Sequence, residues 1–112
     1  MAMRQISVRE LKARLDDASS AKPLLLDVRE AWEYEICHID GSTPIPLGRL
    51  MERRDELAAH DPATEIVAIC HHGVRSFQAC MLLRQAGFPA VANLQGGVAA
   101  WASEVDPTMP HY

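Results

Sequence analysis

The segment Cys70-His71-His72-Gly73-Val74-Arg75-Ser76 separates two stretches of different periodicity. Before it, residues 65–69 form a short apolar run with β-branched side chains, which predicts a buried strand. After it, residues 76–87 favour a helix that ends at Gly87, with Pro89 just beyond. This helix is apolar nearly all round, which predicts that it is largely buried. The sequence therefore places a cysteine at the point where a strand ends and a helix begins.

This position favours a reactive thiol on Cys70. Gly73 permits a tight turn, and a turn of this kind can point successive N–H groups at an anion. The N-terminus of the following helix adds a partial positive charge, and Arg75 adds a permanent cation with a planar donor fork. A buried structural cysteine is the alternative, but the histidines, glycine and arginine beside Cys70 argue against burial. We therefore expect a thiolate that acts as a nucleophile.

The rest of the chain alternates between strand and helix patterns. Further strands are expected near residue 6, at 24–28, near residue 45 and at 90–94. Further helices are expected from a capping box at 7–10 through residue 15, at 31–34, over 47–58 and from 96 onward. This alternation predicts an α/β fold with a parallel sheet, whose site lies beyond the carboxyl ends of the strands. Cys70, Asp27 and Leu94 are expected at that edge.

Length and composition limit the function classes. The 112 residues suffice for one domain, expected over 1–112 with an extended tail over 103–112. A net charge of −4 argues against nucleic acid as the main partner. No apolar run reaches the roughly 18 residues of a membrane span, and the N-terminus lacks the apolar core of a signal peptide. The three cysteines have irregular spacing, which favours neither a disulfide framework nor a metal site. A cytoplasmic location is expected.

Three other segments accompany the cysteine loop in order and spacing: Leu26-Asp27-Val28-Arg29-Glu30, then His38-Ile39-Asp40-Gly41 followed by Ile45-Pro46-Leu47, then Leu94-Gln95-Gly96-Gly97-Val98-Ala99-Ala100-Trp101. Together with Cys-x-x-Gly-x-Arg-Ser they resemble the motifs of the rhodanese family of sulfurtransferases. The resemblance covers the chain from Ile6 to the tail. It implies a five-stranded parallel sheet with helices on both faces.

The resemblance also implies a chemistry. Cys70 would take a sulfur atom from thiosulfate or another persulfide donor and pass it to cyanide or a thiol, through a persulfide and without cofactor or metal. A sulfur-relay protein is a further expected partner. The loop residues that would bind substrate are His71, His72, Gly73, Val74, Arg75 and Ser76. Arg75 has two candidate roles, because in the family this arginine either contacts the donor or turns inward to a carboxylate that braces the loop.

Two other readings of the loop remain open. A cysteine-dependent phosphatase or arsenate reductase places five residues between cysteine and arginine, whereas four lie between Cys70 and Arg75. The shorter loop leaves too little room for a phosphoryl group on the sulfur. A non-catalytic rhodanese-like sulfur-carrier or binding module is the other alternative. Such modules often lose the cysteine that this chain keeps.

The supporting residues have two candidate roles each. Asp27 either orients the loop or caps a turn. Arg29 either forms a surface ion pair with Glu30, which would contribute little, or lines the site entrance. His71 and His72 are expected to be loop residues of tunable charge rather than metal ligands. Much of that charge would be absent at pH 7 for histidines of ordinary pKa, about 6.5.

The remaining cysteines and the tryptophans have structural interpretations. Cys80 lies in the helix after the loop and is expected to be a small apolar filler. Cys37 is expected to be partly buried and structural, with a second reactive thiol as the alternative. Trp32 and Trp101 are expected to be packing anchors.

Overall fold

The computed structural model describes residues 3–112. Its strands are β1 (Gln5–Ile6), β2 (Leu24–Asp27), β3 (Thr43–Pro44), β4 (Ile66–Ile69) and β5 (Val91–Leu94). Its helices are α1 (Val8–Asp16), α2 (Ala31–Ile36), α3 (Arg54–Ala58), α4 (Val74–Gln85) and α5 (Gly97–Glu104), with a 3₁₀ turn over Leu47–Arg49. Strands and helices alternate along the chain, as the sequence pattern predicts.

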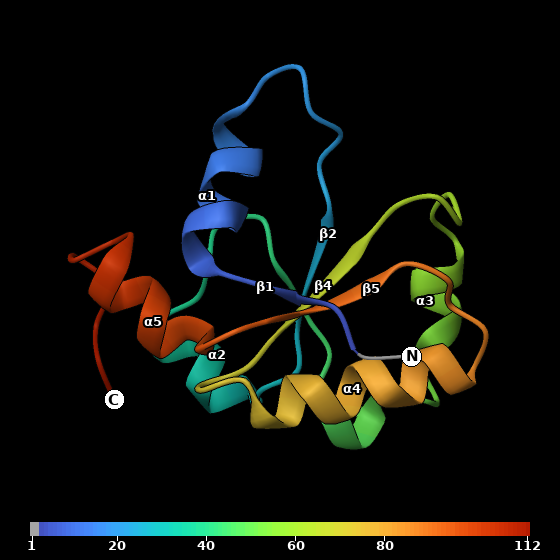
Figure 1. The fold of residues 1–112 in the computed structure, drawn as a ribbon. Coiled ribbons are helices and arrows are strands. Elements are labelled where there is room, and N and C mark those ends of the chain that lie inside the picture. Colours follow the sequence, from blue (N-terminus) through green and yellow to red (C-terminus); the bar gives the residue numbers. More distant parts are fainter. Residues whose placement is uncertain (1–2) are drawn as a thin grey trace.

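The strands form one parallel sheet in the order β1-β5-β4-β2-β3 (Figure 1). The five-stranded parallel sheet is therefore confirmed. β4 is the central strand, and its last residue, Ile69, is in register with Asp27 of β2. Cys70, the next residue, consequently lies at the carboxyl edge of the sheet, close to the end of β2.

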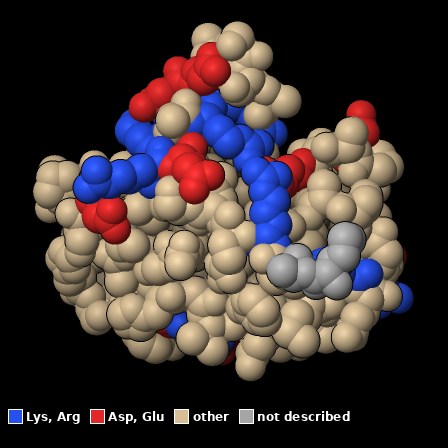
Figure 2. Space-filling model, in the orientation of Figure 1, with Lys and Arg blue, Asp and Glu red and all other residues tan. Residues whose placement is uncertain are grey.

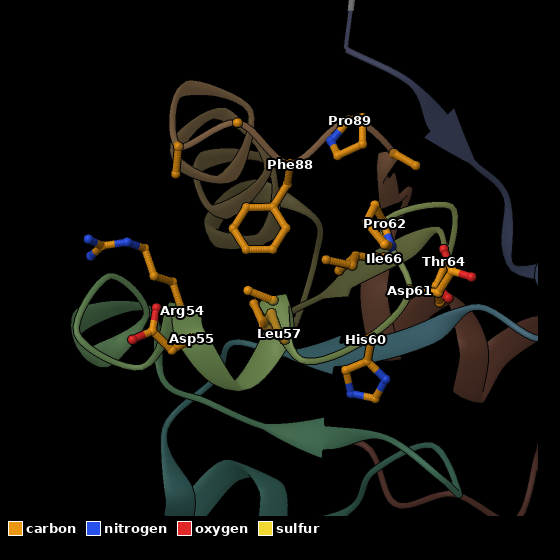
Figure 3. A pocket seen from close by; sticks show the side chains of 14 residues that line it. Arg54, Asp55, Leu57, His60, Asp61, Pro62, Thr64, Ile66, Phe88 and Pro89 are labelled. Atoms are coloured by element: carbon orange, nitrogen blue, oxygen red, sulfur yellow. The ribbon is translucent and has the colours of Figure 1, made fainter.

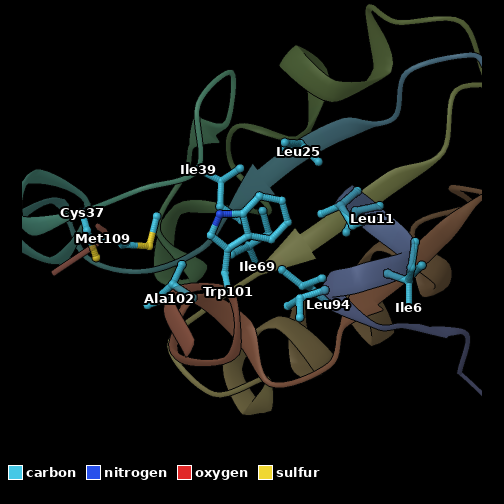
Figure 4. Packing of buried hydrophobic residues seen from close by; sticks show 14 residues of the cluster. Ile6, Leu11, Leu25, Cys37, Ile39, Ile69, Leu94, Trp101, Ala102 and Met109 are labelled. Atoms are coloured by element: carbon cyan, nitrogen blue, oxygen red, sulfur yellow. The ribbon is translucent and has the colours of Figure 1, made fainter. Parts of the chain in front are cut away.

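The sheet is covered on both faces because its strand residues alternate between two apolar clusters. Val67 and Ile69 belong to the cluster that contains residues of α1 and α5, with Trp101 near its centre (Figure 4). Ile66 and Ala68 belong to the cluster that contains residues of α3 and α4. All four residues of β4 are buried, as expected for a strand between two helical layers. This rigid central strand holds Cys70 at its end.

The first helix begins as its sequence predicts. The Ser7 hydroxyl accepts a hydrogen bond from the Glu10 N–H at 3.1 Å, and the Glu10 carboxylate accepts one from the Ser7 N–H at 3.4 Å. This reciprocal pair is a capping box, which satisfies two N–H groups that the helix itself leaves unpaired. The capping box is confirmed.

Several local predictions were wrong. The helix expected over residues 47–58 is a 3₁₀ turn and a short helix with turns between them. α4 was expected to be largely buried, but its side chains Val74, Phe77 and Met81 are exposed. α5 extends through Glu104, so the tail begins later than residue 103.

The two tryptophans differ in burial. Trp101 is 6% exposed and packs in the core, as predicted, whereas Trp32 is 60% exposed and is not a core anchor. Within residues 3–112, no helix is both long enough and apolar enough to cross a bilayer.

Candidate functional site

The thiol of Cys70 is buried and hydrogen-bonded. The residue is 1% exposed, which corrects the expectation that its polar neighbours keep it out of the interior. The Gly73 N–H donates to the Cys70 sulfur at 3.0 Å, and the Ser76 hydroxyl lies 3.3 Å from it. Because both groups can donate to a negatively charged sulfur, the loop stabilises a thiolate that has little water around it.

A second pair of contacts holds the Ser76 hydroxyl in place. Asn93 donates from its amide nitrogen to the carbonyl of Gly73 at 3.1 Å and to the side chain of Gln5 at 3.0 Å. These bonds turn the amide oxygen of Asn93 toward the Ser76 hydroxyl, which donates to it. The hydroxyl can thus give its proton to Asn93 beside a thiol and to the sulfur beside a thiolate. Asn93 was missed in the sequence, because an asparagine inside a strand carries no local functional signal.

The first turn of α5 binds the backbone carbonyls at the start of the cysteine loop. The Val98 N–H donates to the carbonyl of Cys70 at 2.9 Å, and the Ala99 N–H donates to that of His71 at 3.0 Å. Gly97 has a φ of +57°, and a Cβ there would overlap the carbonyl oxygens of both Cys70 and His71. The glycine is therefore required both by its backbone conformation and by the close approach of two chain segments.

This contact predicts the effect of Gly97→Ala. We expect it to lower the free energy of unfolding by about 2–4 kcal/mol, because the cost of a left-handed backbone at alanine adds to the cost of the steric overlap. We also expect a displaced loop to reduce by about 100-fold the sulfur transfer that the sequence resemblance implies. Chemical denaturation and transfer kinetics measure the two effects.

Gly87→Ala is the matched control for this substitution. Gly87 also has a positive φ, +96°, but nothing lies within 4 Å of the position of its Cβ. It should share the conformational cost of about 1–2 kcal/mol and leave transfer unchanged. Equal loss of transfer in both variants would contradict the role given to Gly97.

Arg75 is paired with a carboxylate. Its two terminal nitrogens donate to the two carboxylate oxygens of Glu33, at 2.6 and 2.9 Å. Glu33 belongs to α2, and its side chain is 5% exposed. The hydrogen bonds from Arg75 lower the pKa of Glu33 to about 2, so the pair is ionised throughout the neutral range. Of the two roles predicted for Arg75, the structure contains the bracing one. Glu33 itself was missed in the sequence.

Asp27 and Arg29 form a buried ion pair at the end of β2. Arg29 donates from Nε to Oδ1 of Asp27 at 2.9 Å and from Nη2 to Oδ2 at 2.7 Å, and both side chains are at most 1% exposed. Arg29 also donates to the carbonyl of Cys37 at 2.7 Å. The prediction of a surface ion pair between Arg29 and Glu30 was therefore wrong. Asp27 orients Arg29, which in turn fixes the segment that follows α2.

The side chain of Tyr112 returns from the tail to the site. Its hydroxyl accepts from Nη1 of Arg29 at 2.9 Å and donates to Oε2 of Glu33 at 2.7 Å. Burial raises the pKa of this phenol to about 12, so it stays protonated. Its ring stacks on that of His71, with centroids 4.0 Å apart and planes 7° apart. Tyr112 was missed because the pattern of the tail gives no sign that it folds back.

The two loop histidines stack on each other, with centroids 4.1 Å apart. Burial is the main cause that lowers the pKa of His71, and the neighbouring His72 lowers it further, while Glu33 opposes the shift. His71 is therefore mostly uncharged at neutral pH. Within residues 3–112, no group of three His, Cys, Asp or Glu side chains is placed to hold a metal ion.

The other cysteines lie inside the apolar clusters. Cys80 is fully buried, and burial raises the pKa of its thiol to about 12, which confirms its role as an apolar filler. Cys37 is 8% exposed and belongs to the cluster around Trp101 (Figure 4). Of the three thiols, only that of Cys70 lies in a loop that supplies hydrogen-bond donors to it.

Two hollows lie at opposite ends of β4. A groove of about 480 Å³ borders the cysteine loop and includes Gly73 and Asn93 in its lining. A cavity of about 330 Å³ lies near the start of β4, where Leu57, Ile66 and Phe88 converge (Figure 3). No cysteine lines this second cavity.

A family model and the most similar known proteins agree on one family. The model of the Rhodanese-like domain matches residues 7–104. The chain is 40% identical over 107 residues to "Probable adenylyltransferase/sulfurtransferase MoeZ" of Mycobacterium tuberculosis, covering 96% of this chain and 26% of that protein. It is 38% identical over 102 residues to "Putative sulfur carrier protein YrkF" of Bacillus subtilis, covering 91% of this chain and 52% of that protein.

A solved structure agrees with these relatives. Thiosulfate sulfurtransferase from Pseudomonas aeruginosa superimposes with a TM-score of 0.79 at 32% identity, over 90% of this chain and 19% of that chain. This chain spans about a quarter of the length of MoeZ and about half of that of YrkF. Their additional segments have no counterpart in the 112 residues compared.

Proposed function

Since the chain belongs to the rhodanese-like family, we propose that it is a sulfurtransferase that carries a sulfane sulfur as a persulfide on Cys70. The observation that carries the proposal is the geometry of this thiol. It follows the central strand, lies in the turn before α4, receives a hydrogen bond from the Gly73 N–H, and has the Ser76 hydroxyl 3.3 Å from its sulfur. Thiosulfate and organic persulfides are the donors that this chemistry accepts.

The transfer proceeds in two displacements. The Cys70 thiolate attacks the outer sulfur of the donor, the S–S bond of the donor breaks, and sulfite or a thiolate leaves with the bonding electrons. The persulfide on Cys70 then gives its outer sulfur to cyanide or a thiol acceptor, which restores the Cys70 thiolate. The Gly73 N–H and the Ser76 hydroxyl stabilise the negative sulfur before and after each displacement.

The names of the relatives support two versions of this function. MoeZ is called a sulfurtransferase and YrkF a sulfur carrier. A carrier would be loaded once and would pass its sulfur to a bound partner protein, whereas an enzyme would turn over repeatedly with small acceptors. Both versions require the persulfide on Cys70, and a sulfur-relay protein fits either of them as a partner.

Steady-state kinetics distinguish these versions. We expect repeated turnover with thiosulfate as donor and cyanide as acceptor. Double-reciprocal plots at several cyanide concentrations should give parallel lines, because sulfite leaves before cyanide reacts. A single loading without turnover would favour the carrier. Intersecting lines would contradict a free persulfide intermediate.

Phosphatase activity should be negligible. Four residues separate Cys70 from Arg75, and Arg75 is held by Glu33 rather than turned toward the sulfur. A phosphoryl group on Cys70 would thus lack both space and a bidentate partner. Hydrolysis of para-nitrophenyl phosphate measures this directly. Turnover that disappears in Cys70→Ser would contradict the expectation.

A further inference from the structure

Both arginines at the site are already paired with carboxylates. Arg75, the only Lys or Arg in the loop over residues 70–76, makes two hydrogen bonds to Glu33. Arg29 is paired with Asp27 and is fully buried. An anionic donor that approaches Cys70 therefore meets guanidinium groups whose charge is compensated.

The wall formed by His71 and Tyr112 is also largely uncharged. Tyr112 bridges the two ion pairs, since its hydroxyl accepts from Arg29 and donates to Glu33. This bridge holds Glu33 in place against Arg75. The ring of Tyr112 covers one face of His71, whose charge is disfavoured by burial and by His72, Arg29 and Arg75 and favoured only by Glu33.

The groove beside the loop is lined by no Lys, Arg, Asp or Glu. It has a volume of about 480 Å³ and is lined by Gln5, His72, Gly73, Val74, Phe77, Gln78, Asn93, Gln95 and Gly96. The surface around the groove also carries few charges, since charged side chains gather over α1 and are sparse over α4 (Figure 2). Amides can bind polar groups without net charge, and the exposed side chains of Val74 and Phe77 can contact hydrocarbon.

We propose that the donor is an organic persulfide, R–S–SH, whose R group lies in this groove, and that Glu33 sets this preference by holding Arg75 away from the donor. This inference rests on the proposed function. In the step itself, the Cys70 thiolate bonds to the outer sulfur of neutral R–S–SH and the S–S bond of the donor breaks. RS⁻ leaves with the bonding pair, and the proton stays on the new Cys70 persulfide. The step needs no oxidant or reductant.

Thiosulfate is disfavoured by the same charges. It is a dianion, and it must reach a thiolate of a residue that is 1% exposed. Its charges therefore lose their hydration, and both arginines at the site are already paired with carboxylates. A neutral persulfide avoids this penalty and gains contacts from R in the groove. Glu33 is a positioning residue here, because it acts on the donor only through Arg75.

The first test compares thiosulfate with cysteine persulfide, whose R group is a zwitterion without net charge. Stopped-flow loading of Cys70 gives kcat/KM for each donor. We expect cysteine persulfide to exceed thiosulfate by at least about tenfold, which corresponds to one lost charge contact. Equal efficiencies would overturn the inference alone. Failure of both donors to load Cys70 would overturn the proposed function, and the inference with it.

Two variants then test the cause. Glu33→Gln frees the charge of Arg75, and Gln78→Lys places a cation in the groove on an exposed position of α4. Each should raise kcat/KM for thiosulfate by about tenfold and so shift the ratio of the two donors toward thiosulfate.

Gln85→Lys is the matched control, because it adds the same charge at the far end of α4, outside the groove. It should leave the ratio of the two donors unchanged. An unchanged ratio in Gln78→Lys, which does not disturb the buried pairs, would overturn the inference even if Glu33→Gln fails to fold. The same shift in Gln85→Lys would show a general charge effect and would also overturn it.

Discussion

Cys70→Ser should abolish sulfur transfer while it leaves the fold intact. A serine hydroxyl cannot form a persulfide, so both displacements are lost. The hydroxyl can still accept from the Gly73 N–H and pair with Ser76, which occupy these positions around the sulfur. We therefore expect the free energy of unfolding to change by about 1 kcal/mol or less. Transfer assays and chemical denaturation of the same preparation measure both effects.

Cys37→Ala is the control for this variant. Cys37 is 8% exposed and lies in the apolar cluster around Trp101, while its carbonyl, which accepts from Arg29, is retained. Transfer should persist in this variant. Transfer that survives in Cys70→Ser but disappears in Cys37→Ala would assign the sulfur to Cys37 and contradict the role given to Cys70.

Asp27→Ala should cause the largest loss of stability. It leaves the guanidinium of Arg29 buried without its carboxylate, and breaking a buried pair in this way costs about 3–5 kcal/mol. That is a large share of the roughly 5–15 kcal/mol that stabilises a typical domain. Urea denaturation followed by circular dichroism measures the change.

Asp16→Ala is the matched control for the loss of an aspartate. Asp16 pairs with Lys12 on the exposed face of α1, at 2.9 Å, and both side chains are about half exposed. Exposed pairs of this kind contribute about 0.5 kcal/mol or less. A similar loss in both variants would contradict the importance of burial at Asp27.

The parts of the site that sequence predicts are those that depend on local pattern. An apolar run followed by a cysteine, a glycine and a helix is enough to place Cys70 at the end of β4. The capping box at Ser7 and the glycines before α5 are equally local. Cys70 lies at the edge of the sheet that holds the site because parallel strands bring all their carboxyl ends to one edge.

The residues that were missed reach the site through tertiary contacts. Glu33 and Tyr112 lie 42 and 79 residues apart from their respective partners Arg75 and Glu33. No periodicity in either segment indicates such a contact. The burial of Arg29 was missed for the same reason. An arginine next to a glutamate in the sequence suggests a surface ion pair, and only the tertiary fold shows that Arg29 is buried.

The most direct test of the central claim is the mass of the intact protein after incubation with cysteine persulfide and removal of excess donor. The account predicts the gain of one sulfur atom, located on Cys70 by peptide mapping and lost again when cyanide is added. Cys70→Ser should show no gain. A protein that gains no sulfur, or one whose added sulfur lies on Cys37 or Cys80, would contradict the account.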